Sequence, residues 1–176
     1  FVARHADIVG LSFVHDPEAI FAVQEALRER QAGSLGIVLK IETQQGFQQL
    51  PWLLLAAMRS YPVGVMIARG DLAVECGWER MAEVQEEILW LSEAAHVPVI
   101  WATQVLESLA KKGLPSRAEI TDAAMAERAE CVMLNKGPFV LDAIRMLDGI
   151  LRRMQAHQKK KTATLRRLHV AQVLHN

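Results

Sequence analysis

The chain has 176 residues, enough for one domain with a substantial hydrophobic core. Hydrophobic residues make up 51% of the sequence, which excludes an intrinsically disordered chain. No apolar run reaches transmembrane length, so a membrane-spanning protein is excluded as well. The formal net charge is zero. Cys76 and Cys131 lack a metal-binding spacing. We expect both to be buried small residues of a cytoplasmic protein.

Short apolar runs alternate with helical patterns along the chain. In chain order, we predict a strand at Ile8–Phe13, a helix from Pro17 to Arg30, a strand at Gly36–Glu42, a helix at Gly46–Arg59, a strand at Val63–Ala68, a helix at Glu79–His96, a strand at Val97–Ala102, a helix at Val105–Leu109, a helix at Ser116–Ala129, a strand at Cys131–Leu134, and helices at Phe139–Gln155 and Thr162–Leu174. Asp16 precedes Pro17 as an N-cap, and Ser116 with Glu119 forms a capping box.

Strands that alternate with helices at these intervals predict a parallel sheet of βα repeats. The predicted strands are continuously apolar, as strands covered on both faces should be. Five units do not close an eight-stranded barrel, so the sheet is either open and doubly wound or part of a barrel. No glycine-rich dinucleotide fingerprint follows any strand, which disfavours a Rossmann fold.

Charge is unevenly distributed along the chain. No acidic residue follows Asp148, whereas seven basic residues do. These are Arg152, Arg153, Lys159, Lys160, Lys161, Arg166 and Arg167. We expect residues 159–176 to form a basic C-terminal helix. We expect the positive segment Arg152–Arg167 to dock on the acidic body of the protein or on a neighbouring subunit. No aromatic residue interleaves these charges, so neither nucleic acid nor membrane is an expected partner.

Unusual residues cluster at the C-terminal ends of three successive predicted strands, where βα folds build their active sites. They are Lys40 and Glu42, then Gly70 and Asp71, then Thr103 and Gln104. Lys40 and Glu42 are two residues apart, so we expect both side chains on the same side of the strand.

These residue types suit chemistry on a small oxyacid. Glu42 and Asp71 can hold a hard divalent cation that keeps open positions for a substrate. Lys40 beside that cation would supply a fixed positive charge for a developing enolate or a transferring phosphoryl group. Gly70 allows close approach of the backbone, and the amides after it can bind a carboxylate. Thr103 offers a hydroxyl group.

Four segments resemble pyruvate kinase in order and spacing: Val38–Glu42, Val65–Leu72, Pro98–Ser108 and Pro115–Glu119. Asp7–Phe13 resembles that family's fourth barrel strand, and the resemblance extends to about Gln155. It implies an α/β fold that is a partial TIM barrel, with five βα units corresponding to barrel strands four to eight in residues 1–158.

The resemblance implies transfer of a phosphoryl group from phosphoenolpyruvate to ADP, which gives pyruvate and ATP. By matched position, Lys40 and Thr103 would be catalytic, Glu42 and Asp71 would bind Mg²⁺ or Mn²⁺, and the substrate would contact Ser12, Gly70, Asp71, Thr103 and Gln104. K⁺ is a further cofactor of the family, but its ligands match no residue here. We also expect a homo-oligomer.

The sequence departs from the family in several places. The first three barrel strands are absent, and with them much of the nucleotide site, so ADP and ATP would bind through the missing part. We therefore expect this chain to carry the phosphoenolpyruvate and metal half of the site and to be inactive as a kinase on its own. Asn135–Pro138 is a shorter loop than the family has, and Met125 replaces a usual Asn.

Two other functions remain open at this point. The same lysine and carboxylates would serve a metal-dependent aldolase or lyase acting on a pyruvate enolate. A non-catalytic regulatory relative could also keep the metal and oxyacid site.

Overall fold

The structure is a computed structural model that describes residues 1–158. The predicted basic helix at 159–176 lies outside the described residues. Internal contacts divide the described chain into two compact units, Phe1–Val99 and 100–158.

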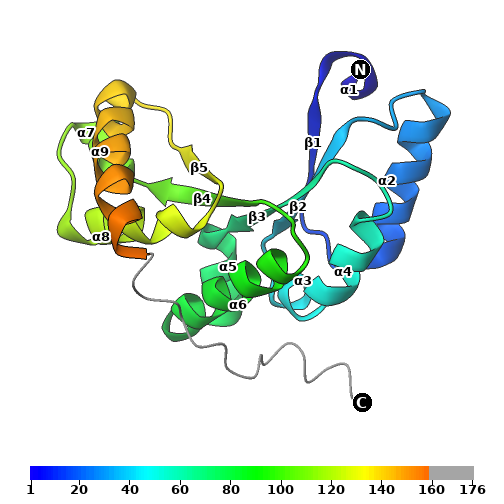
Figure 1. The fold of residues 1–176 in the computed structure, drawn as a ribbon, viewed down its shortest axis with the longest axis horizontal. Coiled ribbons are helices and arrows are strands. Elements are labelled where there is room, and N and C mark those ends of the chain that lie inside the picture. The colour runs from blue at the N-terminus through cyan, green and yellow to red at the C-terminus, as the bar shows by residue number, and fades with distance from the viewer. Residues whose placement is uncertain (159–176) are drawn as a thin grey trace. The chain divides into compact units, whose positions relative to one another are not determined.

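Five parallel strands form one sheet in the order β1-β2-β3-β4-β5 (Figure 1). They are β1 (Ile8–Leu11), β2 (Gly36–Ile41), β3 (Val63–Ala68), β4 (Val99–Val105) and β5 (Cys131–Leu134). Helices alternate with these strands, so the prediction of an α/β fold of parallel βα repeats is confirmed.

The helices of the first unit are α1 (Val2–His5), α2 (Pro17–Glu29), α3 (Gln44–Gln48), α4 (Leu50–Ala57), α5 (Arg69–Cys76), the 3-10 turn η1 (Trp78–Arg80) and α6 (Met81–Ala94). Side-chain caps mark the starts of two of them, α2 and α3. The Asp16 side chain accepts a hydrogen bond from Ala19 N at 2.8 Å, which confirms the predicted N-cap. The single helix predicted over Gly46–Arg59 is two helices, because Thr43 caps α3 and a proline starts α4.

The core of the first unit surrounds β2 and β3. Ile37, Leu39 and Ile41 of β2 are at most 1% exposed. Helices α2 and α4 pack side by side (Figure 1). The buried amide of Gln24 on α2 donates to the carbonyls of Ala56 and Ala57 at the end of α4, at 3.0 and 3.2 Å. Burial on both faces therefore fixes the register of β2, and with it the position of the residues at its end.

The second unit contains most of β4, then α7 (Glu107–Lys112), α8 (Arg117–Met125), the 3-10 turn η2 (Ala126–Arg128), β5 and α9 (Val140–Gln158). α9 packs on α7 and α8, and its Ala143 is fully buried (Figure 1). The helix predicted at Val105–Leu109 is wrong in its bounds, because β4 continues to Val105 and α7 starts only at Glu107. The predicted capping box of Ser116 and Glu119 is confirmed.

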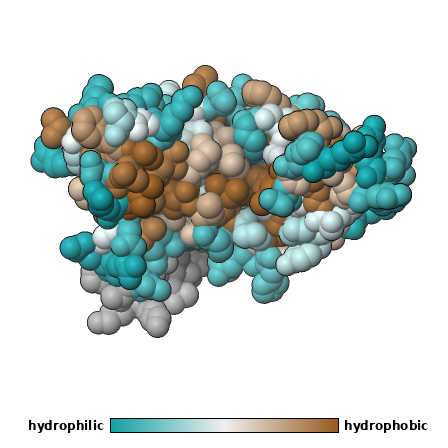
Figure 2. Space-filling model, turned by 90° about the horizontal axis from the view of Figure 1, so that it is seen from above, coloured by the Kyte–Doolittle hydropathy of each residue, from teal (hydrophilic) through white to brown (hydrophobic). Residues whose placement is uncertain are grey.

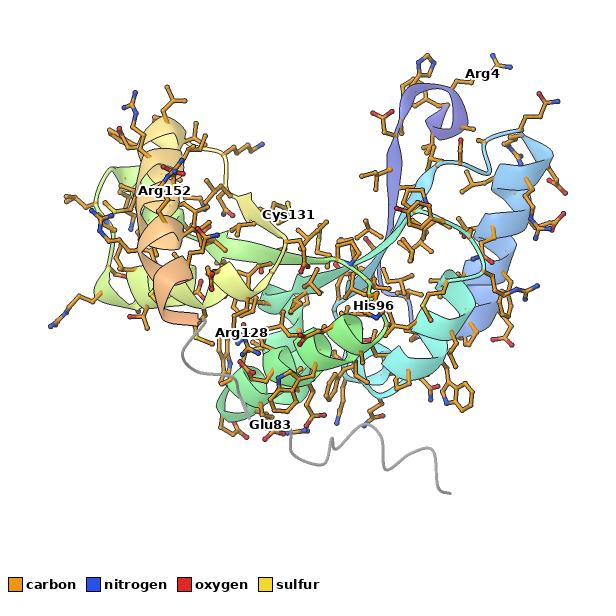
Figure 3. The ribbon with its side chains drawn as sticks, viewed as in Figure 1. Arg4, Glu83, His96, Arg128, Cys131 and Arg152 are labelled. Atoms are coloured by element: carbon orange, nitrogen blue, oxygen red, sulfur yellow. The ribbon has the colours of Figure 1, made fainter. Side chains whose placement is uncertain are left out.

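The two end strands of the sheet are the least covered. Their burial alternates between exposed and intermediate, and Ile8 on β1 is 60% exposed. Cys76 is buried as predicted, but the expectation for Cys131 is wrong: it lies exposed on β5 (Figure 3). Apolar residues also lie open on the face drawn in Figure 2.

Within residues 1–158, no helix combines the length and the apolar character that crossing a membrane requires. Arg152, the first of the seven basic residues after Asp148 (labelled in Figure 3), pairs with Asp148 within helix α9 at 2.9 Å.

The loop before α9 packs tightly against α7. The amide of Phe139 donates to the carbonyl oxygen of Ala110 at 3.0 Å. A Cβ added at Gly137 would overlap that oxygen and lie 2.6 Å from the carbonyl carbon. Because these are backbone atoms of a helix, they cannot move aside as the end of a side chain can. The Asn135–Pro138 loop therefore requires glycine at position 137.

We predict that Gly137→Ala lowers the free energy of unfolding by about 1–3 kcal/mol, the usual range for an overpacked core. Gly149→Ala is the matched control: it lies within α9, and its new Cβ would meet only the tip of Arg153 at 3.0 Å. This control should be neutral or stabilise by up to about 1 kcal/mol. Urea unfolding of both variants measures the difference, and equal midpoints would contradict the argument.

Candidate active site

Lys40 and Glu42 lie at the C-terminal end of β2 and form an ion pair. Lys40 Nζ is 2.7 Å from Oε1 of Glu42, and the two side chains are 27% and 5% exposed. The expectation that both side chains point to the same side of the strand is therefore confirmed. A carboxylate buried to this degree needs charged or polar partners, and Lys40 supplies one of them.

The turn after β1 supplies two further contacts to this pair. Ser12 Oγ accepts a hydrogen bond from Lys40 Nζ at 2.8 Å, and the backbone amide of Phe13 donates to Oε2 of Glu42 at 2.7 Å. Gly10 on β1 lies beside the lysine stem, since a Cβ there would be 3.5 Å from Cδ of Lys40. Ser12, Lys40 and Glu42 thus form one cluster, called here the β2-end cluster.

Sequence reasoning missed the role of Phe13. Its φ is +54°, in the left-handed region that non-glycine residues seldom occupy, and this turn directs its amide toward Glu42. No local signal in the sequence marks a phenylalanine for this conformation.

Gly70 and Asp71 lie in the first turn of α5, which follows β3 directly. The register pairs Ile41 with Ile67, so Glu42 and Ala68 are the next residues of neighbouring strands. Asp71 is exposed. Glu42 therefore follows β2 directly, whereas Asp71 lies in the first turn of the helix that follows the neighbouring strand β3. Their joint binding of a cation stays a prediction.

Thr103 and Gln104 belong to the second unit, in an irregular part of β4. Their φ angles are +63° and +58°. Trp101 pairs with Val132 and Val105 pairs with Leu134, so more residues of β4 than of β5 lie between these two pairs. The strand β4 therefore bulges at Thr103 and Gln104. Two consecutive non-glycine residues in the left-handed region are strained, one of them β-branched, and such strain is concentrated at functional sites.

Glu119 connects the two helices that follow this bulge. Its carboxylate accepts hydrogen bonds from the backbone amides of Ser116, at the start of α8, and Ser108, in the first turn of α7. Burial of this carboxyl group raises its pKa, but the hydrogen bonds from Ser116 and Ser108 outweigh burial, so the net pKa lies below its ordinary value. The Glu119 side chain therefore has a structural role.

The β2-end cluster has the donor types that a divalent cation and an anion require. Glu42 offers hard carboxylate oxygens, and Asp71 offers a second carboxylate from the first turn of α5, after the adjacent strand β3. Within residues 1–158, no group of three or more His, Cys, Asp and Glu side chains is arranged to hold a metal. Two carboxylates fit Mg²⁺, which usually binds one or two carboxylates and keeps its other positions for water and substrate oxygens.

Parallel βα repeats with charged residues at the carboxyl ends of the strands define an α/β chain of the class that builds its active site at that edge of the sheet. Comparison with known families then gives a match over residues 1–139 to the family described as "Pyruvate kinase, barrel domain". The chain belongs to the pyruvate kinase family, and its five strands are part of a TIM barrel.

Individual pyruvate kinases agree with this assignment. The chain is 34% identical over 161 residues to Pyruvate kinase PKLR of Rattus norvegicus, covering 88% of this chain and 27% of that protein. It is 35% identical to Pyruvate kinase of Thermotoga maritima (82% and 31% covered) and 32% identical to Plastidial pyruvate kinase 3, chloroplastic, of Arabidopsis thaliana (94% and 29%). The chain thus spans less than a third of the length of these relatives.

We predict that the stability contributed by Glu119 depends on pH. Because its pKa is lower in the folded chain, this contribution is present above the ordinary carboxyl pKa and is lost as pH falls through the folded value. Glu119→Gln should lower the free energy of unfolding by about 1 kcal/mol at neutral pH, as loss of a helix cap does. It should also flatten the acid dependence of stability.

Urea unfolding between neutral and acidic pH measures both effects. Glu130→Gln, at an exposed position just before β5 in the same unit, is the control for general loss of a carboxylate. An acid dependence as steep in Glu119→Gln as in the wild type would contradict the assignment.

Proposed function

We propose that this chain carries the phosphoenolpyruvate and metal half of a pyruvate kinase-type active site. The overall reaction transfers the phosphoryl group of phosphoenolpyruvate to ADP, and a proton added to the enol carbon completes pyruvate. The observation that carries the proposal is the β2-end cluster, in which Lys40, Glu42 and Ser12 meet at the strand ends of a chain of this family.

Lys40 would be the main catalytic residue, because its ammonium group supplies a positive charge. Its ammonium group lies at the end of β2 on a stem that is 27% exposed, so it can reach a bound anion. Negative charge increases on the enol oxygen and on the transferring phosphoryl group during the reaction. A preorganised cation stabilises that charge more in the transition state than in the ground state. Ser12 would orient the ammonium group through the contact with Nζ.

Glu42 and Asp71 would hold Mg²⁺ or Mn²⁺. When bound, the cation would neutralise phosphate charge and polarise the substrate oxygens. Glu42 is suited to this role because the Phe13 amide fixes the orientation of its carboxylate. Asp71 would add a second, exposed carboxylate from the first turn of α5, the helix after the next strand.

The remaining predicted residues would bind and orient the substrate. The amides of Gly70 and Asp71, in the first turn of α5, would bind its carboxylate. The strained bulge of β4 supports functional roles for Thr103, near the carbon that is protonated, and for Gln104.

The other parts of the reaction lie beyond what these residues supply. We propose that ADP and ATP bind mainly through parts of the barrel that match no residue here, that K⁺ binds there as well, and that the protein acts as a homo-oligomer in the cytoplasm. These proposals rest on membership of the family.

The metal assignment predicts that Glu42→Ala and Asp71→Ala each weaken Mn²⁺ binding by about tenfold or more in the presence of oxalate, an enolpyruvate mimic. Loss of even an outer-shell partner of a metal ligand typically costs about 10–100-fold in affinity, so loss of a direct ligand should cost at least the lower value. Electron paramagnetic resonance of free Mn²⁺ measures the affinity. Glu29→Ala, an exposed carboxylate at the end of α2, is the matched control and should bind as the wild type does. Unchanged affinity in both site variants would rule out the assignment.

The catalytic assignment predicts that the purified chain exchanges the methyl protons of pyruvate with solvent when Mg²⁺ is present, because this partial reaction needs only the groups proposed here. Lys40→Ala should slow the exchange by about 10²–10³-fold, the usual effect of one lost transition-state contact. Proton NMR in D₂O follows the exchange, and ATP formation from phosphoenolpyruvate and ADP is measured in parallel. Exchange that is independent of Lys40, or ATP formation by this chain at about 1–10³ s⁻¹, would contradict the proposed division of the site.

A further inference from the structure

The two oxygens of Glu42 are held in different ways. Oε2 accepts the backbone amide of Phe13 at 2.7 Å, whereas Oε1 is 2.7 Å from the ammonium group of Lys40. A backbone amide cannot leave its acceptor unless the turn itself changes. A lysine ammonium group sits on a flexible stem and can move to another anion. Oε1 is therefore the oxygen that another cation can take.

From this asymmetry, we propose that the ammonium group of Lys40 occupies the position of the metal when no metal is bound. In the unliganded chain it holds the cation position at Oε1 of Glu42 and neutralises the buried carboxylate. When a divalent cation takes that oxygen, the displaced ammonium group becomes available to an anionic substrate. This inference rests on the proposed function, because it requires a cation at Glu42.

Ser12 stabilises the closed arrangement. Its hydroxyl oxygen lies 2.8 Å from Lys40 Nζ, so it helps to hold the ammonium group where it meets Glu42. Displacement of Lys40 by a cation breaks both contacts at once. Removing the Ser12 hydroxyl should therefore weaken the competition by Lys40 without changing any charge in the site.

The exchange of partners couples the two ligands. Lys40 can neutralise either Glu42 or a bound anion. A metal at Glu42 therefore favours the anion, and the anion favours the metal by the same factor, because binding linkage is reciprocal. A tetrahedral anion that binds Mn²⁺ only weakly, such as sulfate, should accordingly tighten Mn²⁺ binding through Lys40.

The test is Mn²⁺ titration of the purified chain, with and without sulfate, for the wild type and four variants. Lys40→Met should bind Mn²⁺ about tenfold more tightly or better, since it lacks the competing charge-assisted contact. Ser12→Ala should bind about threefold more tightly or better, because Lys40 loses a hydrogen bond that is charge-assisted but exposed to water. Glu42→Gln should bind much more weakly than the wild type. Arg30→Gln, which removes an exposed positive charge at the end of α2, should bind as the wild type does.

A second readout is thermal stability. Without Lys40 the buried Glu42 carboxylate keeps the Phe13 amide but loses its ion pair. Lys40→Met should therefore melt at a lower temperature and recover more on adding Mn²⁺ than the wild type does. If Lys40→Met does not fold, Ser12→Ala decides the question, because it keeps every charge.

The outcomes separate this inference from the proposed function. If Glu42→Gln binds Mn²⁺ as the wild type does, the metal assignment fails and the inference fails with it. If Glu42→Gln binds weakly but neither Lys40→Met nor Ser12→Ala binds more tightly, Lys40 does not compete with the metal and this inference alone is overturned. It is likewise overturned, with the metal assignment intact, if sulfate tightens Mn²⁺ binding equally with and without Lys40.

Discussion

Parallel pairing of β2 with β3 is the constraint on which the candidate site depends. Because the strands run in the same direction and are buried on both faces, their register cannot slip without exposing the core. This pairing brings the residues after Ile41 and Ile67 to one edge of the sheet. Glu42 and the segment that contains Gly70 and Asp71 meet this edge as a consequence of the fold.

The turns that follow the strands then give the side chains their orientation. At the end of β1, the left-handed conformation of Phe13 places a backbone donor on Glu42. In the second unit, Thr103 and Gln104 adopt the same unusual region of backbone conformation within β4. Unfavourable conformations persist only where the surrounding structure holds them. Both units therefore concentrate strain beside residues that the family resemblance assigns to the substrate.

The segments that resemble pyruvate kinase also contain residues with a structural role. Ser108 and Glu119 come from two different segments that resemble pyruvate kinase, and their contact joins the start of α7 to the start of α8. Lys40 combines both kinds of role, because it neutralises a buried carboxylate and is also the proposed catalytic charge. The role of each residue in a family-like segment therefore has to be assigned separately, according to what its side chain contacts.

The sequence by itself determined the features that depend on neighbours along the chain. The bounds of β3 and β5, the Asp16 cap and the Ser116–Glu119 capping box follow from apolar runs and short-range hydrogen-bonding patterns. The two-residue spacing of Lys40 and Glu42 likewise fixed their shared side of the strand. Only the tertiary structure decided that Phe13 donates to Glu42 and that Ser12 holds Lys40, contacts that span 29 and 28 residues. It also decided that Cys131 is exposed, since exposure depends on which strand ends the sheet. Periodicity encodes which face a residue lies on, but the group it meets there depends on how distant segments close around it.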